Sequence, residues 1–340
     1  MHSEIYNQVT QNMGLVDLSD RCWVEVKGGD SKKFLNGILT NNIQTLQPKT
    51  GCYSCLCTPK GKMIADLFCY NCPPLQPGGR SENYFGIDCS SKLKLTLLET
   101  LKKYIIFQKV ELFDQTDKWG TCAVIGPKVN GEKGLGDPQC WPWGFVRGPH
   151  GNTEGQDPTL SLRANYDYDF VEWEGFKIWM IRKTMWGLPA FEMWVARDQL
   201  PSLKSKLNVP ELDPETQEVL RIESATPLFG VDMDENTIPQ EANLYTALSF
   251  NKGCYVGQEV IARLEHRGHV GKQLRSLKLE GDKIPQRGEK IFSEDGQEIG
   301  TVTSSCFSPK FSSPIALGYI RYASLSLKEV RIGNSTANFL

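Results

Sequence analysis

Apolar residues alternate with polar ones, or recur at helical spacing, through the first part of the chain, and they predict a mixture of strands and helices. The segment "CWVEVKG" (22–28) has the composition of a strand. In "DSKKFLNGILTNNI" (30–43) the apolar residues fall at helical spacing, and Asp30 or Ser31 can cap the helix. In "CYSCLCTPKGKMIADLFCYNC" (52–72) two β-prone runs flank "TPKG", whose proline and glycine indicate a turn, so we predict a hairpin.

The pattern continues with one strand, one helix and two loops. "YFGIDCS" (84–90) is typical of a strand. "SKLKLTLLETLKKYII" (91–106) predicts an amphipathic helix with an inward row made of Leu93, Leu97, Leu98, Leu101 and Ile105. The Gly- and Pro-rich stretches 73–83 and 127–160 predict loops.

Further along, "FKIWMIRK" (176–183) and "FEMWVA" (191–196) predict two more strands. "DPETQEVLRIES" (213–224) predicts a helix with Asp213 as its N-cap and Pro214 at its first helical position. From about residue 275 the sequence changes to short runs in which apolar and polar residues alternate, among them "LRSLKLEG", "EIGTVTSS" and "IALGYIRYA". The Asp295–Gly296 pair indicates a hairpin turn, and we predict a small all-β unit there, either a barrel or a sandwich.

Composition narrows the class of protein. The chain has 340 residues, of which 40% are hydrophobic and 23% charged, as in ordinary globular proteins of two or three structural units. Its net charge of −2 argues against a general binder of polyanions, so we expect no direct contact with nucleic acid. No apolar run is long enough to span a bilayer, so we expect no membrane partner.

The N-terminal residues and the cysteines bear on the compartment. "MHSEIYNQVTQNMGLVDLSD" has neither the basic nor the apolar region of a signal peptide. The 11 cysteines are an odd number in a chain too large to need disulfides, so we interpret them as thiols in a reducing compartment. We expect a cytoplasmic location, or a mitochondrial or plastid one if a presequence has been removed.

One cysteine stands in a setting that favours chemistry. In "KGCYVGQE" (252–259), Lys252 can lower the pKa of the Cys254 thiol by its charge, and the following residues look helical. A cysteine just before a helix also lies near the positive end of the helix dipole. Against this stands the alternative of a buried, inert cysteine in a turn between two glycines.

The segments around Cys254 resemble those of a known family. Residues 252–259 match the K-G-C-Y-x-G-Q-E hallmark of the YgfZ family, which belongs to the folate-binding superfamily of glycine-cleavage T-proteins. "FGVDMDENTIPQEA" (229–242), with Phe229 where tyrosine is commoner, is similar to the family pattern upstream, and Arg263 matches downstream. "GDSKKFLNGILTNNI", "TPKGKMIADL" and "IGTVTSSCFSP" resemble it too, so the likeness covers nearly the whole chain.

The resemblance implies a fold and a function. The family fold is α+β, with three parts in a cloverleaf and a small C-terminal β-barrel. We expect two interwoven α/β subdomains in residues 1–274 and the barrel in residues 275–340. Members support the assembly or repair of iron–sulfur clusters, with tetrahydrofolate as cofactor. They act through the hallmark cysteine, here Cys254, with Lys252 as its partner.

Two departures distinguish this chain from the transferases of the superfamily. Those enzymes carry paired carboxylates in a G-G-x-x-D-D-L segment, where this chain has Ala65 and Asp66. They also bind the pterin through a glutamate that aligns with Leu188. The candidate folate-binding residues that remain are Asp66, Arg221, Glu223, Tyr255, Gln258, Glu259 and Arg263.

Four of these candidates have an ordinary alternative. Asp66 is either a remnant of the transferase site or a hydrogen-bonded residue of the hairpin. Glu223 either points into a cavity or faces solvent. Arg221 and Arg263 either grip the glutamate tail of a folate or form salt bridges.

Three other groups of residues raise the question of metal or ligand binding. Five cysteines within 52–72 include C-x-x-C pairs, and His266 and His269 lie three residues apart after the hallmark. We interpret the cysteines as buried hydrophobic residues and the histidines as helix-end residues, and we predict no metal site. Trp141, Trp143 and Trp186 either line a pterin site or serve packing.

The sequence therefore predicts a tetrahydrofolate-binding accessory factor for iron–sulfur cluster assembly or repair. Its expected partners are folate and iron–sulfur assembly proteins or client cluster enzymes, with an indirect effect on cluster-dependent tRNA modification. The alternative is a tetrahydrofolate-dependent aminomethyl or methyl transferase. A metal-binding scaffold built on the cysteines of 52–72 is the third hypothesis.

Overall fold

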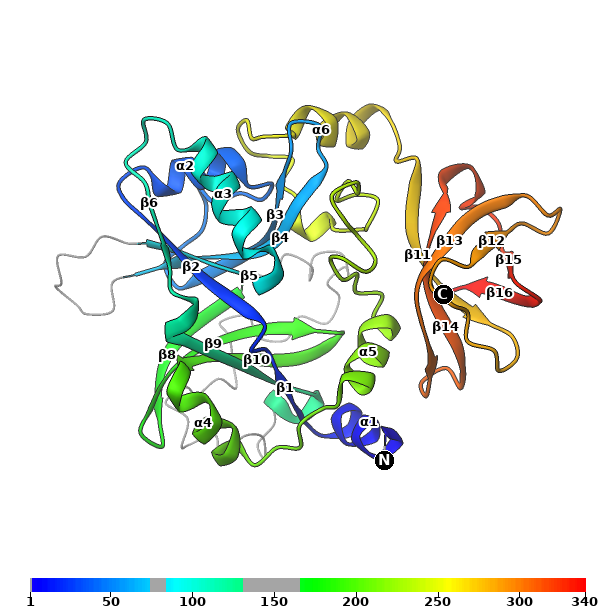
Figure 1. Cartoon of the computed structure of the whole chain (residues 1–340), viewed down its shortest axis with the longest axis horizontal. Coiled ribbons are helices and arrows are strands. Elements are labelled where there is room, and N and C mark those ends of the chain that lie inside the picture. The colour runs from blue at the N-terminus through cyan, green and yellow to red at the C-terminus, as the bar shows by residue number, and fades with distance from the viewer. Residues whose placement is uncertain (1, 74–83, 131–165) are drawn as a thin grey trace, which may run out of the picture. The chain divides into compact units, whose positions relative to one another are not determined.

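The computed structural model describes residues 2–73, 84–130 and 166–340 (Figure 1). They form two compact units. Unit 1 consists of Met1–Ser54 and Leu67–Asp213, and unit 2 consists of Cys55–Asp66 and Pro214–Leu340. The chain therefore enters unit 2 twice, first through the tip of a hairpin and then through its C-terminal third. None of the helices in the described ranges has the length and apolar character needed to cross a membrane.

The first part of the chain supplies the elements of unit 1 and the hairpin. Its helices are α1 (His2–Gln11), α2 (Ser31–Ile38), α3 (Lys94–Tyr104) and α4 (Leu200–Leu207). Its strands are β1 (Gly14–Asp17), β2 (Arg21–Lys27), β3 (Thr50–Cys57), β4 (Met63–Cys72), β5 (Tyr84–Ser90), β6 (Glu111–Asp114), β7 (Trp119–Ile125), β8 (Tyr166–Trp173), β9 (Phe176–Met185) and β10 (Leu188–Ala196). They form a ten-stranded sheet in the order β1-β7-β10-β9-β8-β3-β4-β5-β2-β6.

The second part of the chain supplies two helices and a barrel. The helices are α5 (Pro214–Glu223) and α6 (Gln258–Arg267). The strands are β11 (Lys272–Leu279), β12 (Lys290–Phe292), β13 (Glu298–Ser308), β14 (Ser313–Arg321), β15 (Glu329–Ile332) and β16 (Ser335–Phe339). They close into a barrel in the order β11-β14-β13-β12-β15-β16.

Strand β9 contains a continuous run of apolar residues because both of its faces are buried. Ile178 and Met180 pack in one buried cluster, whereas Trp179 and Ile181 pack in another. Successive side chains of a strand point to opposite faces, so both faces of this strand are covered. The second cluster, here called the aromatic cluster, consists mainly of Trp23, Tyr70, Tyr84, Tyr168, Trp179 and Trp194.

Charged residues are buried beside the aromatic cluster. Lys183 pairs with Glu192, which also accepts a 2.6 Å hydrogen bond from Trp194 Nε1. Arg21 Nε donates to Asp88 Oδ1 over 2.6 Å, and burial raises the pKa of Asp88 despite the guanidinium. Such pairs cost desolvation, so removing one partner is more damaging than the pair is stabilising.

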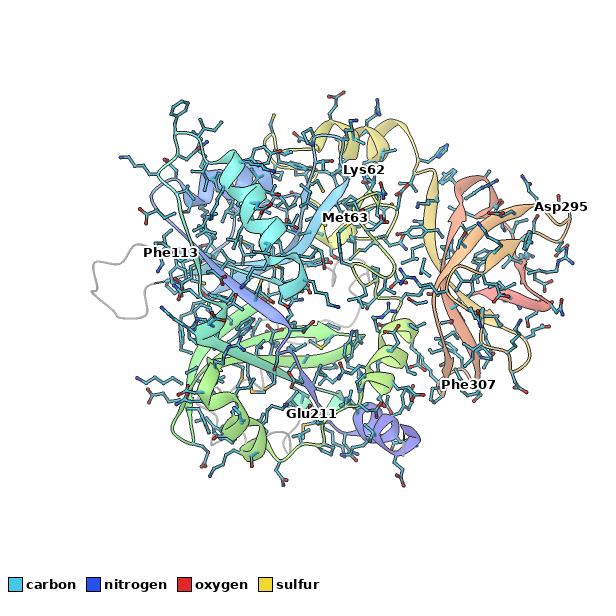
Figure 2. The ribbon with its side chains drawn as sticks, viewed as in Figure 1. Lys62, Met63, Phe113, Glu211, Asp295 and Phe307 are labelled. Carbon is cyan, nitrogen blue, oxygen red and sulfur yellow. The ribbon has the colours of Figure 1, made fainter. Side chains whose placement is uncertain are left out.

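The barrel of unit 2 encloses its own core. Leu277, Ile291, Val302, Ile320 and Val330 are buried in it. The predicted hairpin turn at Asp295–Gly296 joins β12 to β13, where Gly296 has a φ of 85° and donates to Ser293 O over 3.0 Å. Asp295, labelled in Figure 2, lies at this turn.

The predicted fold class, α+β with a C-terminal β-barrel, is confirmed. The division at residue 274 and the cloverleaf arrangement of three parts stay predictions, and the first barrel strand begins at Lys272. The hairpin in 52–72 and the helices in 30–43, 91–106 and 213–224 are present. The predicted loops at 73–83 and 127–160 lie mostly outside the described residues.

The predicted cap of the helix in 30–43 is confirmed in its position but not in its side-chain bond. Asp30 occupies the N-cap position of α2, but its carboxylate makes no capping bond to that helix. It accepts a 2.8 Å hydrogen bond from the backbone N–H of Lys109 instead. The side chain thus ties the start of α2 to the segment that follows α3, a contact that a local pattern cannot indicate.

A substitution at Gly86 tests the packing of the aromatic cluster. A β-carbon there would lie 2.1 Å from Cζ2 of Trp23. We expect Gly86→Ala to lower the free energy of unfolding by about 1–3 kcal/mol, because the indole must move. Urea unfolding measures this. At Gly29 a β-carbon would meet nothing within 4 Å, so Gly29→Ala should stay within about 0.5 kcal/mol of wild type. Equal stability of the two variants would contradict this packing.

Candidate functional site

Cys254 lies in an irregular loop four residues before α6 begins at Gln258. Its side chain is exposed, whereas Cys306 is half-buried and the other cysteines in the described ranges are buried. The alternative of a buried Cys254 is therefore wrong. A thiol at the surface, on a loop that precedes a helix, is accessible to a reactant, a cluster or a partner.

Tyr255 anchors the loop and holds Lys252. Its side chain is 7% exposed, and the ammonium of Lys252 lies 4.7 Å from the centroid of its ring, within the range of a cation–π contact. The hydroxyl of Tyr255 is buried with no hydrogen-bond partner among the described residues. Burial raises the pKa of Tyr255, and the nearby thiols of Cys57 and Cys55 add to this.

The turn of the β3–β4 hairpin packs against the start of α6. Gly257 has a φ of 85°, and a β-carbon on it would lie 2.7 Å from the carbonyl oxygen of Thr58. Gly61, with a φ of 73°, faces Val260 in the same way, at 3.1 Å. Two glycines therefore allow the turn and the hallmark segment to approach at backbone distance.

The segment 237–241 joins the hairpin and the helix. The backbone N–H of Met63 donates to Thr237 O over 2.9 Å, and Gln240 Nε2 donates to Ile261 O over 2.7 Å. Glu241 accepts from the N–H of Ile238 over 3.1 Å and so fixes the turn. Lys62 and Met63, labelled in Figure 2, lead out of the hairpin turn into β4.

Three segments that resemble the same family in sequence thus meet within unit 2: the "TPKG" turn, the "TIPQEA" segment and the "KGCYVGQE" loop. Sequence reasoning assigned no role to Gln240, although its Oε1 is buried without a partner among the described residues. Gln240 lies in the "TIPQEA" segment, which resembles the family in sequence, and that location is the signal by which it could have been found.

The two positions of the lost carboxylate pair differ in burial. Ala65 is fully buried in β4, whereas the next residue, Asp66, is half-buried, as the alternation of a strand requires. Leu188, the position of the pterin glutamate in the transferases, is the first residue of β10 in unit 1 and is half-buried. Trp186 precedes it in the turn, and Trp141 and Trp143 lie outside the described residues.

Arg221 is the centre of a buried network in unit 2. Its guanidinium donates to Glu218 at 2.5 and 2.7 Å, to Asp232 Oδ2 at 2.6 Å and to Ser304 at 2.8 Å. Burial acts against its charge, but the two carboxylates raise the pKa of Arg221. Asp232 also accepts from Thr303 at 2.5 Å. These contacts tie α5 to the barrel strand β13.

The remaining candidates lie in two places. Glu223, at the end of α5, accepts from the hydroxyl of Ser308 and from the N–H of Lys310, so it also joins α5 to the barrel. Gln258 is half-buried, and Glu259 and Arg263 are exposed on α6. Ligand binding by any of these residues stays a prediction.

The question of metal binding arose from the cysteines of 52–72 and from two histidines, His266 and His269. In the described ranges, no three His, Cys, Asp or Glu side chains gather as a metal site requires. The five cysteines within 52–72 are buried thiols, and burial raises the pKa of Cys57 and of Cys72 to about 12. His269 stacks on Tyr322, with ring centroids 3.8 Å apart.

Two sequence profiles place this architecture among known proteins. Residues 2–131 match the GCVT N-terminal domain, and residues 272–336 match the glycine cleavage T-protein C-terminal barrel domain. The chain belongs to the glycine cleavage T-protein family. As a T-protein relative, it carries its exposed cysteine between the regions that the two profiles match.

Individual T-protein relatives cover most of the chain. It is 28% identical over 323 residues to an aminomethyltransferase from Chloroherpeton thalassium, covering 93% of this chain and 81% of that one. It is 28% identical over 340 residues to an aminomethyltransferase from Thermosipho melanesiensis, covering 96% and 83%. The fold is similar to the crystal structure of the glycine cleavage system aminomethyltransferase T from Bartonella henselae. That match has a TM-score of 0.80, 19% identity, and coverage of 100% of this chain and 88% of that one.

Selective alkylation tests the accessibility of Cys254. In the folded protein at pH 8, we expect iodoacetamide to label Cys254 at least about tenfold faster than Cys57, because a buried thiol with a pKa of about 12 stays protonated. Peptide mass spectrometry at successive times measures both rates. The difference should vanish in urea. Comparable labelling of both cysteines in the folded protein would contradict the placement of the loop.

A pair of glycine variants tests how the loop is held. Gly257→Ala should lower the free energy of unfolding by about 1–3 kcal/mol, since the β-carbon meets Thr58 and φ is positive. Gly253→Ala, in the same loop, meets nothing within 4 Å and should resemble wild type. Thermal unfolding of the two variants measures the difference. A Gly257→Ala protein as stable as Gly253→Ala would refute the contact between the turn and the loop.

Proposed function

We propose that this protein is a YgfZ-type member of the T-protein family: a tetrahydrofolate-binding accessory factor for iron–sulfur cluster assembly or repair that acts through Cys254. The observation that carries the proposal is the exposed thiol of Cys254 in a loop fixed by Tyr255 and Gly257. A thiol needs this combination of access and fixed position to serve as nucleophile, redox group or cluster ligand.

The same proposal is supported by two positions at which this chain lacks the carboxylates of the aminomethyl transferases. Ala65 stands where the transferases have one of two adjacent carboxylates, and it is fully buried. Leu188 stands where they have the pterin glutamate, and an aliphatic side chain cannot pair with the N–H donors of a pterin. Two polar requirements of the transferase reaction are therefore unmet at these positions.

Folate binding rests on the side chains that remain. Asp66 offers a half-buried carboxylate for pterin donors, and Gln240 Oε1 and the Tyr255 hydroxyl are buried polar atoms without partners among the described residues. Arg221 is committed to Glu218 and Asp232, so Arg263, exposed on α6, is the better candidate for the carboxylate tail. Bound tetrahydrofolate would supply a carrier for one-carbon units.

A second function, aminomethyl transfer to tetrahydrofolate, is favoured by the names of the relatives. Several aminomethyltransferases match more than 90% of this chain. Those names favour the second function over the first, whereas the side chains at positions 65, 188 and 254 favour the first. A purified protein that forms methylenetetrahydrofolate from an aminomethyl-lipoyl donor would establish the second.

The proposed partners follow from the first function. They are iron–sulfur assembly proteins or enzymes that receive or keep clusters, and an effect on tRNA modification would pass through such an enzyme. The near-neutral charge of −2 supports a partner that is a protein rather than RNA. The proposed location is the cytoplasm, or an organelle if a presequence is removed.

Complementation tests the proposal and separates the two functions. A bacterium without its own YgfZ-type protein would express wild type, Cys254→Ala or the control Cys306→Ala, whose half-buried thiol lies on β13 in the same unit. The readout is the activity of a cluster-dependent tRNA-thiomethylating enzyme at matched expression. We expect rescue by wild type and by the control, and a loss of about tenfold or more with Cys254→Ala.

Other results would redirect the assignment. Equal rescue by all three proteins would keep the accessory function and remove Cys254 from it. Failure of wild type to rescue, together with aminomethyl transfer in vitro, would overturn the accessory function in favour of the transferase.

A further inference from the structure

Two cysteines far from each other in sequence face each other inside unit 1. Cys22 on β2 and Cys89 on β5 are directly opposed in an antiparallel pair, and their sulfur atoms lie 3.2 Å apart. Both side chains are fully buried and both are free thiols. Neither belongs to the Cys254 loop, and the function proposed above uses neither of them.

We propose that Cys22 and Cys89 form a modification site: a dithiol that hydrogen peroxide or a similar small peroxide converts to an intramolecular disulfide across β2 and β5. The inference is independent of the function proposed for Cys254.

The backbone already has the geometry that the bond needs. Opposed residues of an antiparallel pair have Cα atoms about 4.5–5.5 Å apart, within the range of about 4.4–6.8 Å that disulfides span. The sulfurs need to approach only from 3.2 Å to about 2.05 Å. Rotation of the two side chains can supply this without a change of strand register.

The surroundings favour reaction at Cys22. The hydrogen-bonded Cys89 thiol lowers the pKa of Cys22 and the positive charge of Arg21 acts in the same direction, whereas burial and the charge of Asp88 act against them. Lys94, the first residue of α3, also lies close enough to interact electrostatically with Cys22. Cys22 is therefore the thiol that ionises first and attacks, and Cys89 is the thiol that resolves.

The chemistry balances with one peroxide. The Cys22 thiolate takes one oxygen from hydrogen peroxide, giving a sulfenic acid and hydroxide, which takes up the proton that Cys22 lost and leaves as water. The Cys89 sulfur then attacks the sulfenic sulfur, and the S–S bond forms as a second water leaves. Two thiols and one peroxide give one disulfide and two waters. A dithiol reductant reverses the step.

The bond would act on the other face of the same two strands. Trp23 follows Cys22 and Asp88 precedes Cys89, and these two residues are themselves opposed across β2 and β5. Trp23 belongs to the aromatic cluster, and Asp88 pairs with Arg21. A disulfide would therefore link β2 to β5 directly behind the buried charge pair and the indole.

Trypsin separates the two cysteines into peptides that each hold one thiol, residues 22–27 and 81–92. The full-length protein in a Cys254→Ser background, which removes the exposed thiol, is treated with hydrogen peroxide. It is then alkylated in denaturant, digested and analysed by mass spectrometry. We expect the linked pair to form at least about tenfold faster than any other cysteine-linked pair, since the thiols are already in contact. Dithiothreitol should remove it.

Two variants control the result. Cys22→Ser should abolish the linked peptide, whereas Cys122→Ser, which removes a fully buried thiol from β7, should leave its rate unchanged. The proposal is overturned if both peptides stay separately alkylated after peroxide has fully oxidised Cys254 in wild type. It is also overturned if the link forms only in urea. If Cys22→Ser does not fold, the rate in the Cys254→Ser protein and its reversal decide the question alone.

Discussion

At Gly257 the backbone turns with a φ of 85° and passes so close to Thr58 that only a hydrogen atom fits between them. The placement of Cys254 depends on this approach. Because α6 starts directly after Gly257, the contact fixes both the helix and the loop that carries the thiol. Tyr255 completes the anchor, with its ring buried and the ammonium of Lys252 against it. An exposed thiol with a fixed backbone is the result.

The second constraint is that buried charges must be paired, and each unit contains its own buried ion pairs. In unit 2, Arg221 pairs with Glu218 on its own helix and with Asp232, which lies on a separate segment that must be placed before that ion pair can form. In unit 1, Lys183 and Glu192 pair beside Trp194. Breaking such pairs costs about 3–5 kcal/mol, so they favour one arrangement of strands and helices strongly over its alternatives. These ion pairs also explain why charged residues occur within otherwise apolar, buried strands.

Local patterns were sufficient for much of the fold. The hairpin turn at "TPKG", the helix that begins at Pro214 and the barrel hairpin at Asp295–Gly296 all depend on residues within a few positions of each other. Helix α4 (Leu200–Leu207) and strand β8 (Tyr166–Trp173) were not predicted, because a short helix and a strand with weak alternation give little periodic signal. The bond from Lys109 to Asp30 joins residues 79 positions apart, which no window could include.

The candidate site was predicted less completely than the fold. The hallmark identified Cys254, but the meeting of the hairpin turn, Gln240 and α6 follows from tertiary contacts alone. Sequence reasoning paired Lys252 with the thiol through its charge, and the structure adds the ring of Tyr255 as the group that holds it. Arg221 was a candidate for binding the carboxylate tail of a folate, because a guanidinium pairs well with a carboxylate. In the structure it pairs instead with Glu218 and Asp232 of its own unit.

The division of the chain between the units has a consequence for its synthesis. Residues 55–66 belong to unit 2 but are made long before residues 214–340. While the ribosome completes unit 1, the tip of the hairpin has neither Thr237 to pair with Met63 nor α6 to cover Gly61. A nascent chain therefore carries an unpaired hairpin tip through about half of its elongation. For the same reason, no single cut in the sequence yields unit 2 intact.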